Sequence, residues 1–117
     1  MANADFNSRI SEEEITELIR NAAADGLRLA AEHVLAVSNQ RVPHDKGALE
    51  RSGKALVRRR SLLAVVRYNT PYAKVQHEDL YLHHKEGRTP KFLERAVREE
   101  AEVVKLLIAK PIREVLK

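Results

Sequence analysis

The chain contains no cysteine and no tryptophan, and its aromatic residues are limited to three tyrosines and two phenylalanines among 117 residues. Without cysteine there are no disulfides and no thiolate metal ligands. With so few aromatic rings, the chain lacks the stacking platforms on which single-stranded nucleic acids usually bind. No apolar run approaches the roughly 20 residues that cross a bilayer, and the first ten residues lack the apolar stretch of a signal peptide. We therefore expect a soluble, unprocessed protein with no membrane partner.

Signals of catalysis are also missing. The four glycines are isolated from one another, so no loop of the phosphate-cradling kind is present. Ser52 and Ser61 lack the Gly-x-Ser-x-Gly context of a nucleophilic serine, and no cysteine replaces them. The sequence therefore predicts no enzyme, no catalytic residue and no cofactor.

The charge balance is moderately basic. Lysine and arginine number 21 against 17 acidic residues, which gives a net charge of +4 and favours an acidic partner. The length fits a single domain with a modest core.

The apolar pattern predicts a long first helix. Ser11 and Glu14 form a capping-box pattern, and apolar residues then recur at steps of three and four from Ile15 to Val37. A helix ending near Asn39 would be on the order of 40 Å long. Gly26 in its middle indicates a tight contact with another helix, and we expect the alanine-rich surface to face a neighbouring subunit. Residues 1–9 are polar and unpatterned, which predicts a flexible N-terminal arm over residues 1–10.

The middle of the chain favours short elements. Residues 48–52 suit one helical turn after the break at Pro43, and residues 54–59 and 62–68 are rich in residues that favour strands. We expect these two strands to pair antiparallel. Residues 72–77 suit either a short helix or a bend, and residues 78–87 suit an exposed loop or a short edge strand.

A second apolar stripe predicts a C-terminal helix that begins near Thr89 and Pro90. Pro111 is expected to kink or interrupt this helix, so residues 111–117 are expected to be a tail or a short separate helix. The prediction is thus an α+β domain over residues 11–110, in which a long N-terminal helix and a C-terminal helix pack on a small antiparallel β-sheet.

Three stretches stand in a characteristic order: residues 42–52 (VPHDKGALERS), 68–78 (YNTPYAKVQHE) and 87–94 (GRTPKFLE). The residues that define the pattern are Val42, Pro43, Asp45, Gly47, Leu49, Ser52, Tyr72, Ala73, Phe92 and Leu93. In this order and spacing the chain resembles a family of tailed-bacteriophage proteins known as minor capsid, neck, head-tail connector or tail-completion proteins. It departs from the family pattern at Lys46, where a small hydroxyl residue is usual.

The resemblance implies a structural virion protein of the phage neck that is assembled in the cytoplasm of the bacterial host. Copies would form a ring, with six or twelve suiting the family, that helps to join the DNA-filled head to the tail. Its partners would be other neck proteins, proteins near the portal and tail-terminator proteins, with non-specific contact to packaged DNA as a further possibility.

The densest positive cluster consists of Arg58, Arg59 and Arg60, with Arg67 nearby. Three interpretations remain open. The arginines could contact DNA phosphates without reading sequence, they could keep an exposed strand edge from pairing with other chains, or they could meet acidic surfaces of neighbouring subunits. The first interpretation gives the main alternative function, a small basic DNA-binding protein.

A second candidate interface contains His77, Glu78, His83 and His84, with Asp79 between them. Imidazoles and carboxylates are ligands that zinc, manganese or nickel accept. However, a zinc-protease helix needs its two histidines four residues apart, and His77 and His83 are six apart. A hydrated loop or a subunit contact is therefore the favoured interpretation, and a metal-dependent hydrolase using His77, His83 and His84 is the second rival.

Overall fold

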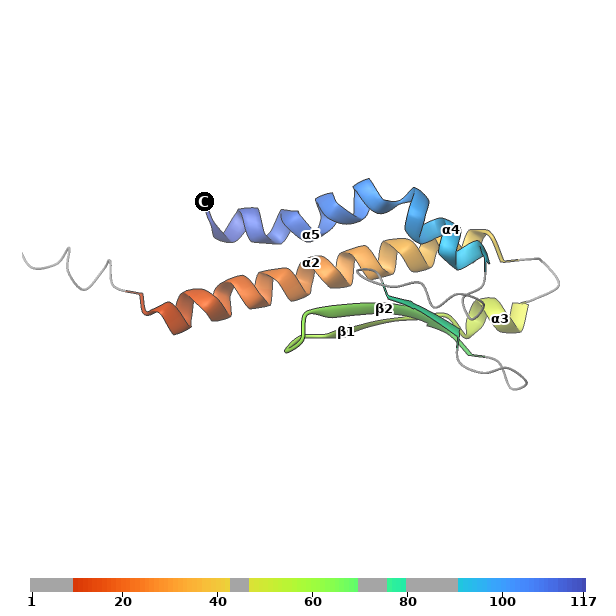
Figure 1. Ribbon diagram of the computed structural model, residues 1–117, viewed down its shortest axis with the longest axis horizontal. Helices are drawn as coiled ribbons and strands as arrows, with labels where there is room; N and C mark the ends of the chain where they lie inside the picture. The colour runs from red at the N-terminus through yellow and green to blue at the C-terminus, as the bar shows by residue number, and fades with distance from the viewer. Residues whose placement is uncertain (1–9, 43–46, 70–75, 80–90) are drawn as a thin grey trace, which may run out of the picture.

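A computed structural model describes residues 10–42, 47–69, 76–79 and 91–117 (Figure 1). Its elements are α2 (Glu12–Gln40), α3 (Gly47–Arg51), β1 (Lys54–Arg58), β2 (Leu63–Tyr68), β3 (Gln76–Asp79), α4 (Lys91–Glu99) and α5 (Ala101–Val115). The expected α+β class is confirmed, with a long N-terminal helix and C-terminal helices accompanying a small antiparallel sheet.

The three strands form one sheet in the order β1-β2-β3, and both pairings are antiparallel. Alternate residues of the central strand, Ala64, Val66 and Tyr68, are buried against α2. Helix α5 packs along α2, and Figure 1 shows α2 lying between α5 and the sheet. The molecule therefore has three layers, and α2 is the middle one.

Helix α2 begins as the sequence predicts. The Ser11 hydroxyl accepts from the Glu14 amide at 3.1 Å, and the Glu14 carboxylate accepts from the Ser11 amide at 3.3 Å, so the capping box is complete. One row of α2, with Leu27, Ala31 and Val34, is buried in the core between the helix and the sheet. Helix α2 packs on the sheet with one side and on α5 with the other, so it carries apolar residues on both sides.

The tight contact predicted at Gly26 lies within the chain. A Cβ placed on this glycine would stand 2.7 Å from the Ile108 Cα and closer still to the Ile108 carbonyl oxygen, so α5 approaches α2 too closely for any side chain. Ala22, Ala30 and Ala31 are also buried within the chain. The alanine-rich surface therefore packs within the chain's own fold and does not face a neighbouring subunit as expected.

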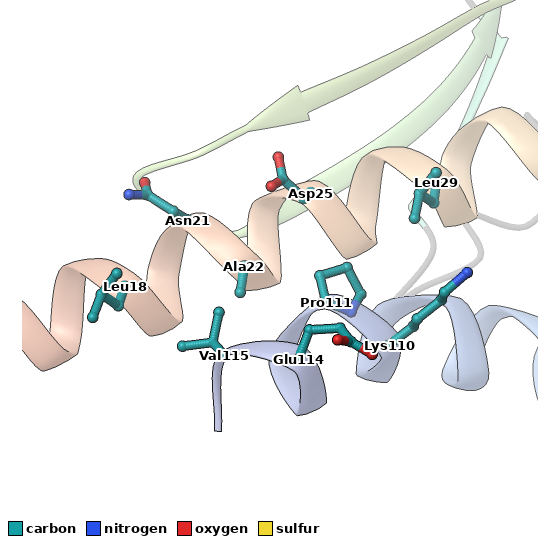
Figure 2. Close-up of a pocket in the computed structure, with 9 residues that line it drawn as sticks. All are labelled: Leu18, Asn21, Ala22, Asp25, Leu29, Lys110, Pro111, Glu114 and Val115. Atoms are coloured by element: carbon teal, nitrogen blue, oxygen red, sulfur yellow. The ribbon is translucent and has the colours of Figure 1, made fainter. Parts of the chain in front are cut away.

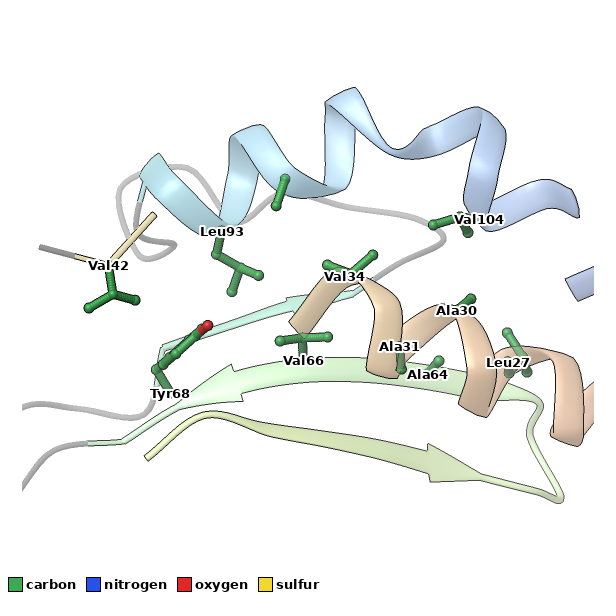
Figure 3. Close-up of a cluster of buried hydrophobic side chains, with 11 residues drawn as sticks. Leu27, Ala30, Ala31, Val34, Val42, Ala64, Val66, Tyr68, Leu93 and Val104 are labelled. Atoms are coloured by element: carbon green, nitrogen blue, oxygen red, sulfur yellow. The ribbon is translucent and has the colours of Figure 1, made fainter. Parts of the chain in front are cut away.

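The core extends along α2 between the sheet and the C-terminal helices, and Tyr68 lies at one end of it (Figure 3). Its hydroxyl donates to Asn39 Oδ1 at 2.6 Å, which leaves Ser38 Oγ, 2.8 Å away, as the donor to the tyrosine oxygen. The ring meets Phe92 edge to face, with 5.2 Å between centroids. The buried cluster comprises Leu27, Ala30, Ala31, Val34, Val42, Ala64, Val66, Tyr68, Leu93, Ala96 and Val104.

The C-terminal region corrects two expectations. The predicted single helix is divided at Glu100 into α4 and α5, and Pro111 lies inside α5, which continues to Val115. The predicted tail at residues 111–117 is therefore wrong. Packing on α2 keeps α5 helical through the proline, because α5 is held against Gly26 of α2 at Ile108, three residues before Pro111.

The break at Glu100 is fixed by contacts with α2. His33 Nε2 donates to Glu100 Oε1 at 2.6 Å, and Arg41 Nη2 donates to Glu99 Oε1 at 2.6 Å. The hydrogen bond from Arg41 lowers the pKa of the Glu99 carboxyl. With the chain bent there, α4 buries Leu93 and Ala96 near Tyr68 while α5 turns to run along α2. One straight helix could not cover both regions.

The strand β3 was only partly anticipated. Its residues, Gln76–Asp79, cross the boundary between the segment expected to be a helix or bend and the segment expected to be a loop or edge strand. Its strand state comes from pairing with β2, in which Arg67 faces His77 and Val65 faces Asp79. The helix start expected at Thr89 and Pro90 lies outside the described residues.

Candidate functional site

The connection between β1 and β2 is held in place by α2. It contains neither glycine nor asparagine, and Leu62 adopts a left-handed conformation with φ 51°, which costs of order 1–3 kcal/mol for such a residue. Arg20 Nη1 donates to the Arg60 carbonyl oxygen at 2.7 Å, and Arg59 Nη2 donates to Glu17 Oε2 at 3.0 Å. These two contacts hold the strained connection against the helix.

The same contacts create a charged concavity of about 400 Å³ lined by Glu17, Arg20, Arg59 and Arg60. We call these four residues the arginine cluster. The side chains of three arginines and one glutamate line it, so the cluster carries two net positive charges. Guanidinium groups form paired hydrogen bonds with phosphate and carboxylate oxygens. The cluster can therefore bind an anionic group, while Glu17 limits its net charge.

The structure divides the positive cluster that the sequence predicts. Arg59 and Arg60 belong to the arginine cluster, whereas Arg58 is the exposed last residue of β1 and pairs with Leu63. Arg67 lies four residue pairs away, opposite Lys54. Arg58, Lys54 and Arg67 therefore belong to the outer face of the sheet, the side away from α2.

The described motif residues have structural roles. Ser52 Oγ donates to the Leu49 carbonyl at 2.7 Å and accepts from the Asn69 amide at 3.0 Å, which joins α3 to the end of β2. Leu93 is fully buried and Phe92 packs on Tyr68. Described residues of all three motif stretches thus meet at one end of the sheet. Gly47 opens α3, whereas Pro43, Asp45, Tyr72 and Ala73 lie outside the described residues.

The histidine-rich candidate interface is described only in part. The backbones of His77 and Glu78 belong to β3 and pair with Arg67 and Val66, and His83 and His84 lie outside the described residues. Within the described ranges, no group of three or more histidine, aspartate or glutamate residues is placed to hold a metal ion. No helix among the described residues is long and apolar enough to span a membrane.

A groove lies between the N-terminal half of α2 and the C-terminal end of α5 (Figure 2). Leu18, Ala22 and Leu29 line it from α2, and Pro111 and Val115 line it from α5. Its volume is about 410 Å³ and its floor is apolar, with Asp25, Lys110 and Glu114 also among its lining residues. The groove marks the place where the packing of α5 on α2 becomes incomplete.

Sequence reasoning missed the contributions of Arg20 and Glu17. Arg20 stands seven residues before Leu27 in the row of α2 that faces the sheet, and it is only about one-third exposed. A charged side chain in an otherwise apolar row was the available signal, because such a residue needs a polar partner on the element it faces. The partner itself, the Arg60 carbonyl, depends on the folded hairpin.

No protein-family model, no curated protein and no solved structure matches this chain.

Proposed function

We propose that the chain is a structural virion protein of a tailed bacteriophage, which forms part of the neck ring that joins the DNA-filled head to the tail. The observation that carries the proposal is the ordered set of three motifs. Ser52, Asn69 and Phe92 come from different motif stretches, and their contacts join α3, β2 and α4 at one end of the sheet. Such convergence is expected when dispersed motifs specify one domain.

In this role the protein acts through its surfaces. Copies assemble around the axis between head and tail, in the virion neck, after synthesis in the host cytoplasm. The described surface carries several exposed large apolar residues on α2 and β1, among them Ile15, Leu18, Ile19 and Leu56. Grouped exposed apolar residues are typical of surfaces that bind other proteins, which suits a protein whose neighbours are copies of itself and other neck proteins.

The proposal is tested by interrupting the gene in its parent phage or prophage. Electron microscopy of the induced lysate then scores heads, tails and joined particles. Separate DNA-filled heads and free tails are the expected result, and empty heads would place the protein earlier, at closure of the portal after packaging. A lysate with normal infectious virions would contradict a joining role.

The arginine cluster favours a second candidate function, non-specific binding to DNA phosphates. Arg20 adds a third guanidinium to those of Arg59 and Arg60, and with Glu17 the cluster carries two net positive charges. Each phosphate neutralised on duplex DNA contributes a slope of about −0.9 to the dependence of log affinity on log salt concentration.

Filter binding across a salt series separates the two functions. DNA-binding activity predicts measurable affinity that falls steeply with salt, and an Arg59→Gln, Arg60→Gln variant should show a slope smaller by about 1–2. Arg98→Gln, an exposed arginine on α4 distant in sequence from the cluster, is the matched control. Absence of binding at low salt, or equal slopes for all variants, would remove this candidate.

A further inference from the structure

Two exposed surfaces of this chain carry large apolar side chains beside charged ones, and the charges have opposite sign. One surface is the N-terminal end of α2 and the other is the face of the sheet that points away from the helices.

The first surface, which we call the α2 knob, consists of residues 12–19. Where α5 packs on α2, the stripe is made of small residues such as Ala22, Gly26 and Ala30. Beyond Val115, where α5 ends, the stripe continues as Ile15, Leu18 and Ile19, of which Leu18 is 46% exposed. The apolar residues of α2 thus change from small to large at the point where α5 no longer covers the helix. Figure 2 shows Leu18 and Val115 at this boundary.

The α2 knob is acidic. Glu12 precedes Ile15 by three residues and Glu14 precedes Leu18 by four, so these carboxylates flank the apolar stripe on the same helix face. Glu13 is exposed on the same turns. Glu17 is already paired with Arg59 in the arginine cluster, so the other three of the four glutamates among residues 12–19 supply the negative charge of the knob. The segment contains no basic residue.

The second surface, the outer sheet face, has the opposite charge. On β1 the exposed residues alternate as Lys54, Leu56 and Arg58, and their partners across the strand pair are Arg67, Val65 and Leu63. Partners directly opposite each other project on the same face. Leu56, which is 41% exposed, therefore lies beside Val65 between basic residues at both ends. Helix α2 covers the opposite face (Figure 1).

The two surfaces also match in size. Eight residues of helix extend about 12 Å, and the five residues of β1 extend about 17 Å. A helix of this length can lie on the strand pair with its apolar stripe over Leu56 and Val65. The two surfaces lie on opposite sides of the sheet in one molecule, so the α2 knob cannot reach the outer sheet face of its own chain.

We propose that the α2 knob of one copy packs on the outer sheet face of a second copy, with Glu12 and Glu14 near Lys54, Arg58 and Arg67. Each copy carries one knob and one face, so the contact is head to tail and repeats until a ring closes or a filament grows. That the copies close into a ring rests on the proposed function. The contact between two copies can be tested with the purified protein alone.

The test uses three leucine-to-glutamate variants of the full chain, each at an exposed position. Leu18→Glu disables the α2 knob, Leu56→Glu disables the outer sheet face, and Leu106→Glu, on α5 at 60% exposed, is the matched control. Sedimentation velocity measures association of each variant alone and of the first two mixed. Circular dichroism and the thermal midpoint verify folding. If either glutamate variant is unfolded, Glu12→Lys and Arg58→Glu test the same two surfaces.

Wild type and Leu106→Glu should form species larger than a dimer. Leu18→Glu and Leu56→Glu should each associate about 100-fold more weakly or worse, because the new carboxylate would enter an apolar contact unpaired. Their mixture should form a one-to-one dimer and nothing larger, since the Leu56→Glu copy still offers a knob and the Leu18→Glu copy still offers a face.

Four results would overturn the proposal: a wild-type chain that stays monomeric at every concentration, variants that associate like wild type, an equal loss with Leu106→Glu, and a mixture without the dimer. Loss with Leu18→Glu alone would mean that the α2 knob pairs with itself or with a different neck protein. None of these results bears on the neck function, which the gene interruption tests separately. Normal virions after gene interruption would contradict the neck function but not the contact between copies.

Discussion

Tyr68 connects the central strand to two helices. Its ring lies between α2 and α4, and its hydroxyl joins Ser38 and Asn39 at the end of α2. Burial raises the pKa of Tyr68 above its ordinary value of 10.0, the Ser38 hydrogen bond partly opposes this, and the negative charge of Glu50 adds to it. The neutral phenol is therefore the form that the fold requires.

This requirement predicts a loss of stability in alkali. Because the unfolded chain releases the Tyr68 proton at a lower pH than the folded chain, the contribution is complete below pH 10 and is lost as the pH rises through the higher folded-state pKa. Tyr68→Phe should cost about 1–3 kcal/mol near neutral pH, through the unpaired Ser38 and Asn39. It should also show a smaller fall in the free energy of unfolding above pH 10. An unchanged alkaline slope in urea titrations would contradict this role.

Gly26 gives a second prediction at the residue scale. Alanine would improve helix propensity by about 1 kcal/mol, but its Cβ would overlap the backbone of Ile108 and force α5 away from α2. Overpacking of this kind costs about 1–3 kcal/mol. We expect Gly26→Ala to lower the free energy of unfolding and Gly26→Val to lower it further.

The matched control for Gly26 is the exposed Asn21 of the same helix. Asn21→Ala changes propensity without filling a contact, so it should be neutral or slightly stabilising in chemical denaturation. A Gly26→Ala protein more stable than wild type would show that α2 and α5 are not in contact at this point.

At the scale of the elements, Pro111 tests how packing overrides local preference. It is the eleventh residue of α5, so its missing N–H leaves the Leu107 carbonyl without its usual helical partner. Since the helix continues through the proline, Pro111→Ala should restore that hydrogen bond and raise the free energy of unfolding by about 1–2 kcal/mol. This gain is smaller than the full difference in helix propensity of about 3 kcal/mol, because the unfolded chain also gains conformational freedom when proline is replaced. Equal or lower stability in urea would contradict a continuous α5.

The elements that sequence predicted well are those specified locally. Ser11 and Glu14 set the start of α2 through contacts three residues apart, and the β1 and β2 strands follow from their composition. The features that the sequence did not predict depend on partners distant in the chain. The break at Glu100 depends on His33, 67 residues away, and the sequence of β3 has little strand preference of its own but pairs with β2.

In the candidate site, too, some residues could be recognised from the sequence and others only from their partners in the fold. Arg59 and Arg60 stand out in the sequence as part of a run of charge, whereas Arg20 joins them only because the hairpin folds back on α2. Arg67 is close to the run in sequence, yet strand geometry places it at the other end of β2. Residue type could thus be predicted from sequence, but the grouping of side chains needed the register of the sheet.

At the scale of the whole molecule, the fold combines a core between the layers with large apolar side chains left exposed outside it. The three layers bury the small residues of α2 on both sides, while Leu18 and Leu56 remain exposed on separate surfaces. A domain that served only itself would gain from covering these residues, since each buried leucine contributes about 1.5–3 kcal/mol. In the proposed head-to-tail contact, both leucines would be covered by a neighbouring copy.

The most direct test of a place in the phage neck is to find the chain in the particle. Antibody raised against the purified protein and coupled to gold is applied to intact virions and to separated heads and tails, and its position is recorded by electron microscopy. A neck protein predicts label at the junction of head and tail and nowhere along the capsid faces or the tail shaft. Label distributed over the capsid or tail, or virions that carry none of this chain, would contradict the account.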